Sequence, residues 1–336
     1  MISSHNLPIF FNHKLYPGVE VTPYLNIERA SITMKNLAPD LLRASENQPC
    51  TLLKMPYEII ELIYKLLDAD DVENFAGSDH LLYQIGQKEL RIHHERRERY
   101  QRVNIGRCDD LDVFGSIEAM LLDCRLSQYP IHVQVVDFGM WGFVGNDFDQ
   151  DVTVCTKDIN SLVGTGRLHQ IAKRLEGCGL SSAEASKITA GVEQADNASI
   201  LGALLSMMPC MTSLALASTF WTSRTFSNIL QALTRVAATS CSKNCQVFNR
   251  LRDVIITNEQ GLNMPVLRTF DILGLFAKIP TVRVLKGYAV SEVGPSGSSW
   301  EDIDKGSSNV EELVVTTIWD CAVEMTRCMP CFKSLK

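Results

Sequence analysis

The sequence lacks the patterns of a membrane-spanning segment and of a signal peptide, and it lacks the positive net charge that is typical of many nucleic-acid-binding proteins. No apolar run in the 336-residue chain reaches the about 18 residues of a membrane-spanning helix, so we expect none. The first residues, MISSHNLPIFFNHKLYPG, hold neither a basic start nor a long apolar stretch, which predicts that they are not a signal peptide. The formal net charge of −7 gives no overall attraction to nucleic acid or to anionic lipid.

Cysteine is present without the pattern of a disulfide framework. The 11 cysteines are odd in number and scattered, unlike the dense sets of small secreted domains. We therefore expect a reducing compartment, the cytoplasm or the nucleus. Apolar residues make up 46% and charged residues 21%, which is typical of a globular protein with a real core. At about 150 residues per domain, the length predicts two units.

Recognisable catalytic and metal-binding motifs are also missing. The sequence has no serine elbow, Walker loop, paired-histidine metal motif or kinase signature. Gly145–Lys157 carries aspartates at the spacing of a calcium loop, but Val152 stands where that turn requires glycine. The Met-Pro-Cys of Cys328–Cys331 occurs again at Met208–Cys210, which favours a structural junction over a redox or zinc pair. We predict no metal, no cofactor and no enzyme activity.

What the sequence does contain is a short, strongly apolar helical stretch, Lys54–Tyr83. Pro56 is pre-set for the start of a helix, and Glu58 lies in its first turn, where an acid favours the dipole. One face of this helix carries Ile59, Ile63, Leu66 and Leu67. Ile60 and Leu62 lie off that face, so apolar surface points two ways. A segment below about 40 residues seldom stabilises itself alone, so we expect a partner to cover this stretch.

The order of residues in this stretch resembles the F-box, whose opening is usually Leu-Pro-x-Glu-(Ile/Leu). Met55 stands for the usual leucine, while Ser78 and Leu82 stand where valine and tryptophan are common. The resemblance implies docking of a Skp-type adaptor and, through it, of a cullin scaffold. An ordinary helical hairpin packed on its own protein is the alternative. The residues that the resemblance assigns to adaptor binding are Met55, Pro56, Ile59, Ile63, Leu66, Leu67, Val72 and Phe75.

The flanking segments have simpler expectations. Residues 1–50 contain five prolines, of which Pro8, Pro17, Pro23 and Pro39 limit every candidate helix, and we expect this segment to be irregular or disordered. Residues 51–90 form the F-box-like helical domain, and residues 91–110 a charged helical connector. In residues 88–104, arginine and glutamate alternate in a helical pattern that favours solvated ion pairs over nucleic-acid binding.

An internal repeat organises residues 111–336. The runs at 207–216, 277–286 and 327–336 each place a proline two residues before an apolar side chain and five before a leucine. Phe248–Leu251 and Val310–Leu313 keep the last part of this pattern. Proline ends a helix, and after a short turn a strand begins whose leucine points inward.

Each predicted strand follows a predicted helix. Ser181 and Glu184 form a capping box that predicts one more helix, ending near Gln194, and a further strand is expected to begin near Lys336. The predicted strands are His132–Phe138, Ser213–Ser218, Arg252–Thr257, Val282–Val290 and Glu312–Ile318. The predicted helices are Ile117–Leu126, Ser199–Met208, Thr225–Ala238, Leu267–Ala277 and Asp320–Cys328.

This alternation predicts an α/β fold class. Helix–strand units stack into a solenoid with a parallel sheet, which resembles an irregular leucine-rich repeat; the later spacings between leucines fit its period of about 20 to 29 residues. A doubly wound sheet is the alternative, and with it an enzyme whose site lies at the carboxyl ends of the strands.

Residues 50–336 as a whole resemble fungal-type F-box proteins with degenerate leucine-rich repeats. The resemblance implies a substrate-recognition subunit of a cullin-type (SCF) ubiquitin ligase, whose repeats bind a protein substrate that the sequence does not identify. Neither nucleic acid nor membrane is an expected partner. A repeat scaffold unrelated to ubiquitin is a third possibility.

Overall fold

The chain divides into two compact units, Met1–His93 and His94–Lys336. The computed structural model describes residues 51–105, 113–136, 166–194, 196–217, 224–239, 247–257, 269–290, 300–317, 326 and 328–335. Residues 1–50 and the loop Gly145–Lys157 lie outside these ranges. No helix in the described part of the chain is long and apolar enough to cross a membrane.

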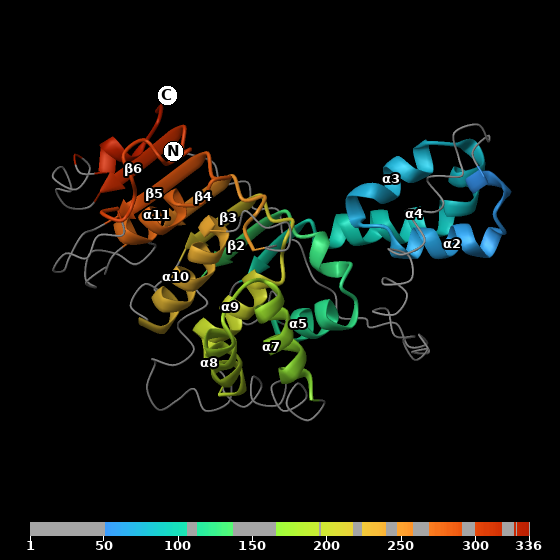
Figure 1. Ribbon diagram of the computed structural model, residues 1–336, viewed down its shortest axis with the longest axis horizontal. Coiled ribbons are helices and arrows are strands. Elements are labelled where there is room, and N and C mark those ends of the chain that lie inside the picture. The colour runs from blue at the N-terminus through green and yellow to red at the C-terminus, as the bar shows by residue number, and fades with distance from the viewer. Residues whose placement is uncertain are drawn as a thin grey trace, which may run out of the picture. The chain divides into compact units, whose positions relative to one another are not determined.

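The first unit is helical, and its first helix begins where the sequence predicts. Pro56 occupies the N-cap position and Leu67 the C-cap position of this helix. The side chain of Asp79, just before α4, accepts a hydrogen bond from the backbone N–H of Leu81 at 2.7 Å. In chain order the elements are η1 (Thr51–Lys54), α2 (Tyr57–Leu66), α3 (Ala69–Gly77) and α4 (His80–Tyr100), seen in Figure 1.

The prediction that the charged run stays helical to residue 104 is wrong at its end. Helix α4 stops at Tyr100, and strand β1 (Arg102–Ile105) follows. Val103 and Ile105 are buried while their neighbours are exposed, which is the period of two of a half-buried strand. Four residues after a long charged helix are too short a pattern to reveal that change of period in the sequence.

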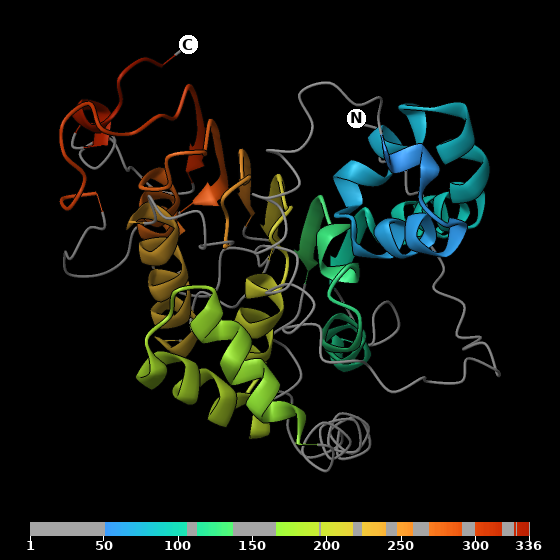
Figure 2. The ribbon, with the colours of Figure 1, turned by 45° about the vertical axis from the view of Figure 1, so that its right-hand side comes forward.

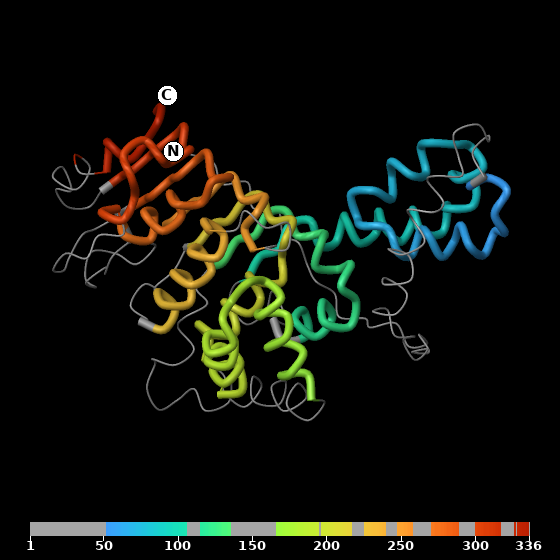
Figure 3. The backbone as a smooth tube through the Cα atoms, in the orientation of Figure 1, coloured from blue at the N-terminus to red at the C-terminus, as the bar shows by residue number. Residues whose placement is uncertain are grey.

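The second unit is a mixed α/β structure built on a six-stranded, entirely parallel sheet. Its strands lie in the order in which they occur along the chain, and the colour in Figures 1 and 3 therefore runs steadily from green β2 to red β6. The five predicted strands are confirmed as β2 (His132–Val136), β3 (Ser213–Ala217), β4 (Asp253–Thr257), β5 (Val284–Val290) and β6 (Glu312–Thr317).

Five of the six predicted helices of this unit are confirmed, as α5, α8, α9, α10 and α11, and α7 is an addition. The capping box forms as predicted: Ser181 Oγ accepts from the N–H of Glu184, and the Glu184 carboxylate accepts from the N–H of Ser181. Most of the predicted helix Asp320–Cys328 lies outside the described residues. The helices are α5 (Val113–Leu122), α7 (Arg167–Gly177), α8 (Ser182–Glu193), α9 (Asn197–Ser206), α10 (Arg224–Thr239) and α11 (Thr269–Ala277), with short turns η2 (Leu126–Gln128) and η5 (Met329–Cys331).

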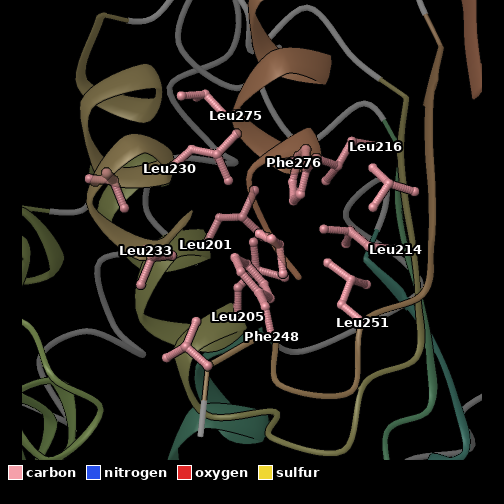
Figure 4. Packing of buried hydrophobic residues seen from close by; sticks show 14 of the residues in the cluster. Leu201, Leu205, Leu214, Leu216, Leu230, Leu233, Phe248, Leu251, Leu275 and Phe276 are labelled. Atoms are coloured by element: carbon pink, nitrogen blue, oxygen red, sulfur yellow. The ribbon is translucent and has the colours of Figure 1, made fainter. Parts of the chain in front are cut away.

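The core of the second unit lies between these helices and one face of the sheet. Figure 4 shows Leu201 and Leu205 of α9 and Leu230 of α10 in the space beside Leu214 and Leu216 of β3. Helices α7 to α11 contact one another in chain order, and Figure 2 shows this layer from a second direction. One inward row across the strands consists of the buried residues Val103, Val133, Leu214, Val254 and Leu285 and of the partly buried Leu313.

The strand register corrects one member of the predicted repeat. Leu214 pairs with Val254, and Val254 pairs with Leu285, so Val254 holds the position that the sequence pattern gave to Leu251. Leu251 is buried three residues earlier and corresponds to Met211. The pattern selected the leucine because no proline marks the end of the preceding helix in this repeat.

The same backbone arrangement joins each strand to the next. The carbonyl of the residue just before one strand accepts two hydrogen bonds, from consecutive N–H groups at the start of the following strand. The acceptors are the carbonyls of Gln101, Ile131, Thr212, Arg252 and Arg283, and all ten distances lie between 2.7 and 3.1 Å. A one-residue slip would break both bonds and turn the inward side chains to the other face, so this arrangement fixes the register.

We predict that the inward row controls the stability of this unit. Leu214→Ala removes a fully buried side chain and should lower the free energy of unfolding by about 2–5 kcal/mol. Gln134→Ala, on the opposite face of the neighbouring strand, should change it by less than about 0.5 kcal/mol because this side chain is exposed. Urea unfolding followed by circular dichroism measures both, and equal effects would contradict the assignment of the two faces.

Candidate functional site

The first unit, which we call the helical unit, is organised around one buried tyrosine. The Tyr64 hydroxyl donates a hydrogen bond to the carbonyl of Leu82 at 2.8 Å, and the Tyr64 ring meets that of Phe75 edge-on at 4.9 Å. Burial raises the pKa of Tyr64, so the hydroxyl stays protonated and able to donate. The other buried members of this small core are Ile60, Val72, Ala76, Leu82 and Leu90.

Gly86 of helix α4 makes room for that ring. A Cβ atom at Gly86 would lie 2.2 Å from Cζ of Tyr64, far inside van der Waals contact. The tyrosine ring therefore packs directly against the backbone of α4 at this point. Tyr64 and Gly86 together set how closely α2 approaches α4.

The opposite side of α2 presents an apolar stripe. Ile59, Leu62 and Leu66 recur at helical spacing, i, i+3 and i+7, and their exposed fractions are 43%, 49% and 45%. Met55, just before the helix, continues the stripe with 39% exposed. We call these four residues the α2 stripe. Eight of the eleven large exposed apolar residues of the described chain lie between Leu53 and Tyr83, so the apolar surface belongs mainly to this unit.

The structure divides the predicted adaptor-binding residues into three groups. Met55, Pro56, Ile59 and Leu66 are exposed; Ile63, Leu67 and Phe75 are half-buried; and Val72 is fully buried. Val72 can support the docking surface but cannot touch a partner. Leu62 belongs to the exposed stripe and is absent from the predicted set, although its spacing from Ile59 and Leu66 carried the signal.

The surroundings of the α2 stripe are acidic. Residues 54–79 hold only Lys54 and Lys65 as cations, whereas the acids in the same range are Glu58, Glu61, Asp68, Asp70, Asp71, Glu73 and Asp79. A hydrogen bond to the Glu61 carboxylate raises the pKa of Tyr57, with smaller contributions from desolvation and from the nearby negative charges. An apolar patch with an acidic rim suits a partner whose own patch is apolar with a basic rim.

A second candidate surface is the sheet face turned away from the helices. Residues of this open face are more exposed than the inward rows, and the register sets them in two rows across the strands. The first row is Arg102, His132, Ser213, Asp253, Val284 and Glu312, and the second row is Asn104, Gln134, Ala215, Ile255, Lys286 and Val314.

One ion pair lies on this open face. Lys286 Nζ is 2.9 Å from a carboxylate oxygen of Glu312 on the neighbouring strand. That hydrogen bond and charge raise the pKa of Lys286, so the pair holds both of its charges near neutral pH. The cation of Lys286 is therefore already compensated within the sheet.

The cysteine pair near the C-terminus fits the structural junction that the sequence predicts. Cys331 is buried, and its Sγ lies 3.7 Å from the carbonyl oxygens of Trp300 and Ile303. Burial raises the pKa of the Cys331 thiol, which disfavours the reactive thiolate. Among the described residues, no cluster of three or more His, Cys, Asp or Glu side chains could hold a metal ion.

We predict opposite effects of alanine at two glycines of the helical unit. Gly86→Ala forces the Tyr64 ring to move and should lower the free energy of unfolding by about 1–3 kcal/mol. Gly77→Ala at the end of α3 meets nothing within 4 Å and should be neutral or stabilising by up to about 1 kcal/mol. Thermal unfolding of the two variants tests this, and a stabilising Gly86→Ala would contradict the close packing of α2 on α4.

Comparisons of this chain with protein-family models, with curated proteins and with solved structures found no match. The functional assignment therefore depends on the two surfaces described above.

Proposed function

We propose that this chain is a substrate-recognition subunit of a cullin-type (SCF) ubiquitin ligase. The helical unit docks a Skp-type adaptor through the α2 stripe. The second unit, which we call the sheet unit, binds a protein substrate. Catalysis takes place elsewhere: the chain holds the substrate near a separate transfer enzyme, which gains rate from proximity. No cofactor or metal is needed for this role.

The observation that carries the proposal is the α2 stripe on a unit too small to cover it. Fully burying an apolar side chain contributes about 1.5–3 kcal/mol, so covering four half-exposed ones favours association by a few kcal/mol in total. Contiguous apolar surface of this kind marks an interaction site on a soluble protein. The F-box resemblance of residues 54–83 names the partner that fits it.

The arrangement of the sheet supports the second half of the proposal. Strands in chain order, each joined to the next by the same pair of hydrogen bonds, suit an irregular leucine-rich-repeat solenoid. In such repeats the units contact only their neighbours and together present one extended surface. We assign substrate binding to the open face.

The two alternatives have less support. An enzyme with a doubly wound sheet has its site where the strand order reverses, and the six described strands have no such reversal. A repeat scaffold outside ubiquitin ligation gives no reason for the exposed α2 stripe.

We predict that charge on the α2 stripe abolishes adaptor capture without unfolding the chain. Ile59→Asp combined with Leu66→Asp should lower the adaptor that co-purifies with the full chain at least about tenfold, because each carboxylate would be buried at the interface. Both side chains point to solvent in the free unit, so the unfolding temperature should change little.

The matched control is Leu122→Asp, since Leu122 is equally exposed, at 48%, on the other unit. It should capture as much adaptor as the wild-type chain. Failure of the wild-type chain to bind a Skp-type adaptor, or unimpaired binding by the double variant, would reject the proposal.

A further inference from the structure

Hydrogen-bond donors gather at one end of the open face. Arg102 of β1 pairs in register with His132 of β2, and Asn104 pairs with Gln134. All four side chains are exposed, and they share a face because alternate residues of a strand point the same way. Neighbouring strands lie about 4.8 Å apart, so the four side chains form one patch, which we call the donor patch.

Among the residues that the structure describes, none satisfies the side chains of the donor patch. Within the part of the chain that the structure describes, none of these four side chains forms an ion pair or a hydrogen bond. Lys286, the other strong cation of the two open-face rows, is paired with Glu312. A carboxylate can receive the planar fork of Arg102 and further N–H donors from its neighbours.

The rest of the second row is largely apolar. Beyond Gln134 the row continues with Ala215 and Ile255 and ends with Val314, all half-buried. Ala215 pairs in register with Ile255 and carries the smaller side chain of the two. The second row therefore changes from amide donors on β1 and β2 to mainly aliphatic side chains on β3 to β6, with Lys286 as the exception.

We propose that the open face binds an extended peptide segment of the substrate, with an acidic side chain on the donor patch and an aliphatic side chain on Ile255. From the middle of the β1–β2 pair to β4 is about 12 Å at the usual strand spacing. An extended peptide covers that span in about four residues at about 3.3 Å each, and residues four apart point to the same face. This inference rests on the proposed function and names its substrate class.

A peptide suits the charges of this face better than a nucleic acid does. Polynucleotide binding depends on neutralising several phosphates in a row, whereas Asp253 and Glu312 lie on the same face beyond the donor patch. The chain as a whole carries a net charge of −7. A single carboxylate meets the donor patch without bringing negative charge onto those two acids.

A random dodecapeptide library displayed on phage, selected on the full chain, tests this inference. The wild-type chain should enrich aspartate or glutamate four residues from an aliphatic residue. Arg102→Glu should replace that acidic preference with a basic one. The control Arg252→Glu changes the same residue type at the amino end of β4, where the side chain is exposed outside the two rows, and should keep the acidic preference.

Synthetic versions of the enriched peptides measure how much the substitution of Arg102 weakens peptide binding. Their affinity for Arg102→Glu should be about three- to tenfold lower than for the wild-type chain, and the difference should shrink in high salt, as expected for an exposed ion pair. Absence of acidic enrichment, or the same preference in wild type and Arg102→Glu, overturns the inference. If a fluorescein-labelled oligouridylate binds more tightly than the peptides and displaces them, the inference is overturned in favour of RNA.

Adaptor capture separates this inference from the proposed function. Arg102→Glu should still co-purify with the Skp-type adaptor, because the α2 stripe is unchanged. If the wild-type chain captures no adaptor but enriches the acidic peptides, the ligase assignment fails while the peptide site is supported. If it captures adaptor and enriches no acidic peptides, the peptide site fails while the ligase assignment is supported.

Discussion

The sheet unit depends on burying two rows of mainly aliphatic side chains along one face of a parallel sheet. Each strand supplies an inward side chain at the same register position, and helices α9 to α11 cover these positions. The paired hydrogen bonds at each strand start keep neighbouring strands from slipping. Because the core is built by the buried face, the side chains of the other face can vary with function.

The helical unit, in contrast to the sheet unit, has too few residues for a large core. It concentrates its packing on Tyr64, whose ring fits against the backbone of α4 at Gly86 and whose hydroxyl is satisfied by the carbonyl of Leu82. With that contact made on one side of α2, the apolar residues of the other side stay exposed. The same short helix therefore packs with one face and leaves an apolar stripe exposed on the other.

Much of this architecture could be predicted from local sequence. Proline at the ends of helices located the strands β3 and β5, Ser181 and Glu184 located the start of α8, and Pro56 located the start of α2. These signals depend on covalent geometry or on residues close in sequence, so they act whatever the tertiary contacts of the segment are. Strand β1 was missed because only Val103 and Ile105 carry its pattern, and Leu251 was placed wrongly because valine and leucine both suit an inward position.

The sequence by itself determined the alternation of helices and strands, the apolar character of Lys54–Tyr83 and the acidic residues around it. Only the tertiary structure decided which side chains of that stretch face solvent: it placed Val72 inside, and Leu62 with Ile59 and Leu66 outside. It alone also brought Arg102 beside His132, thirty residues apart in the chain. Periodicity separates the faces of a helix or strand, but which face is covered depends on contacts between distant segments.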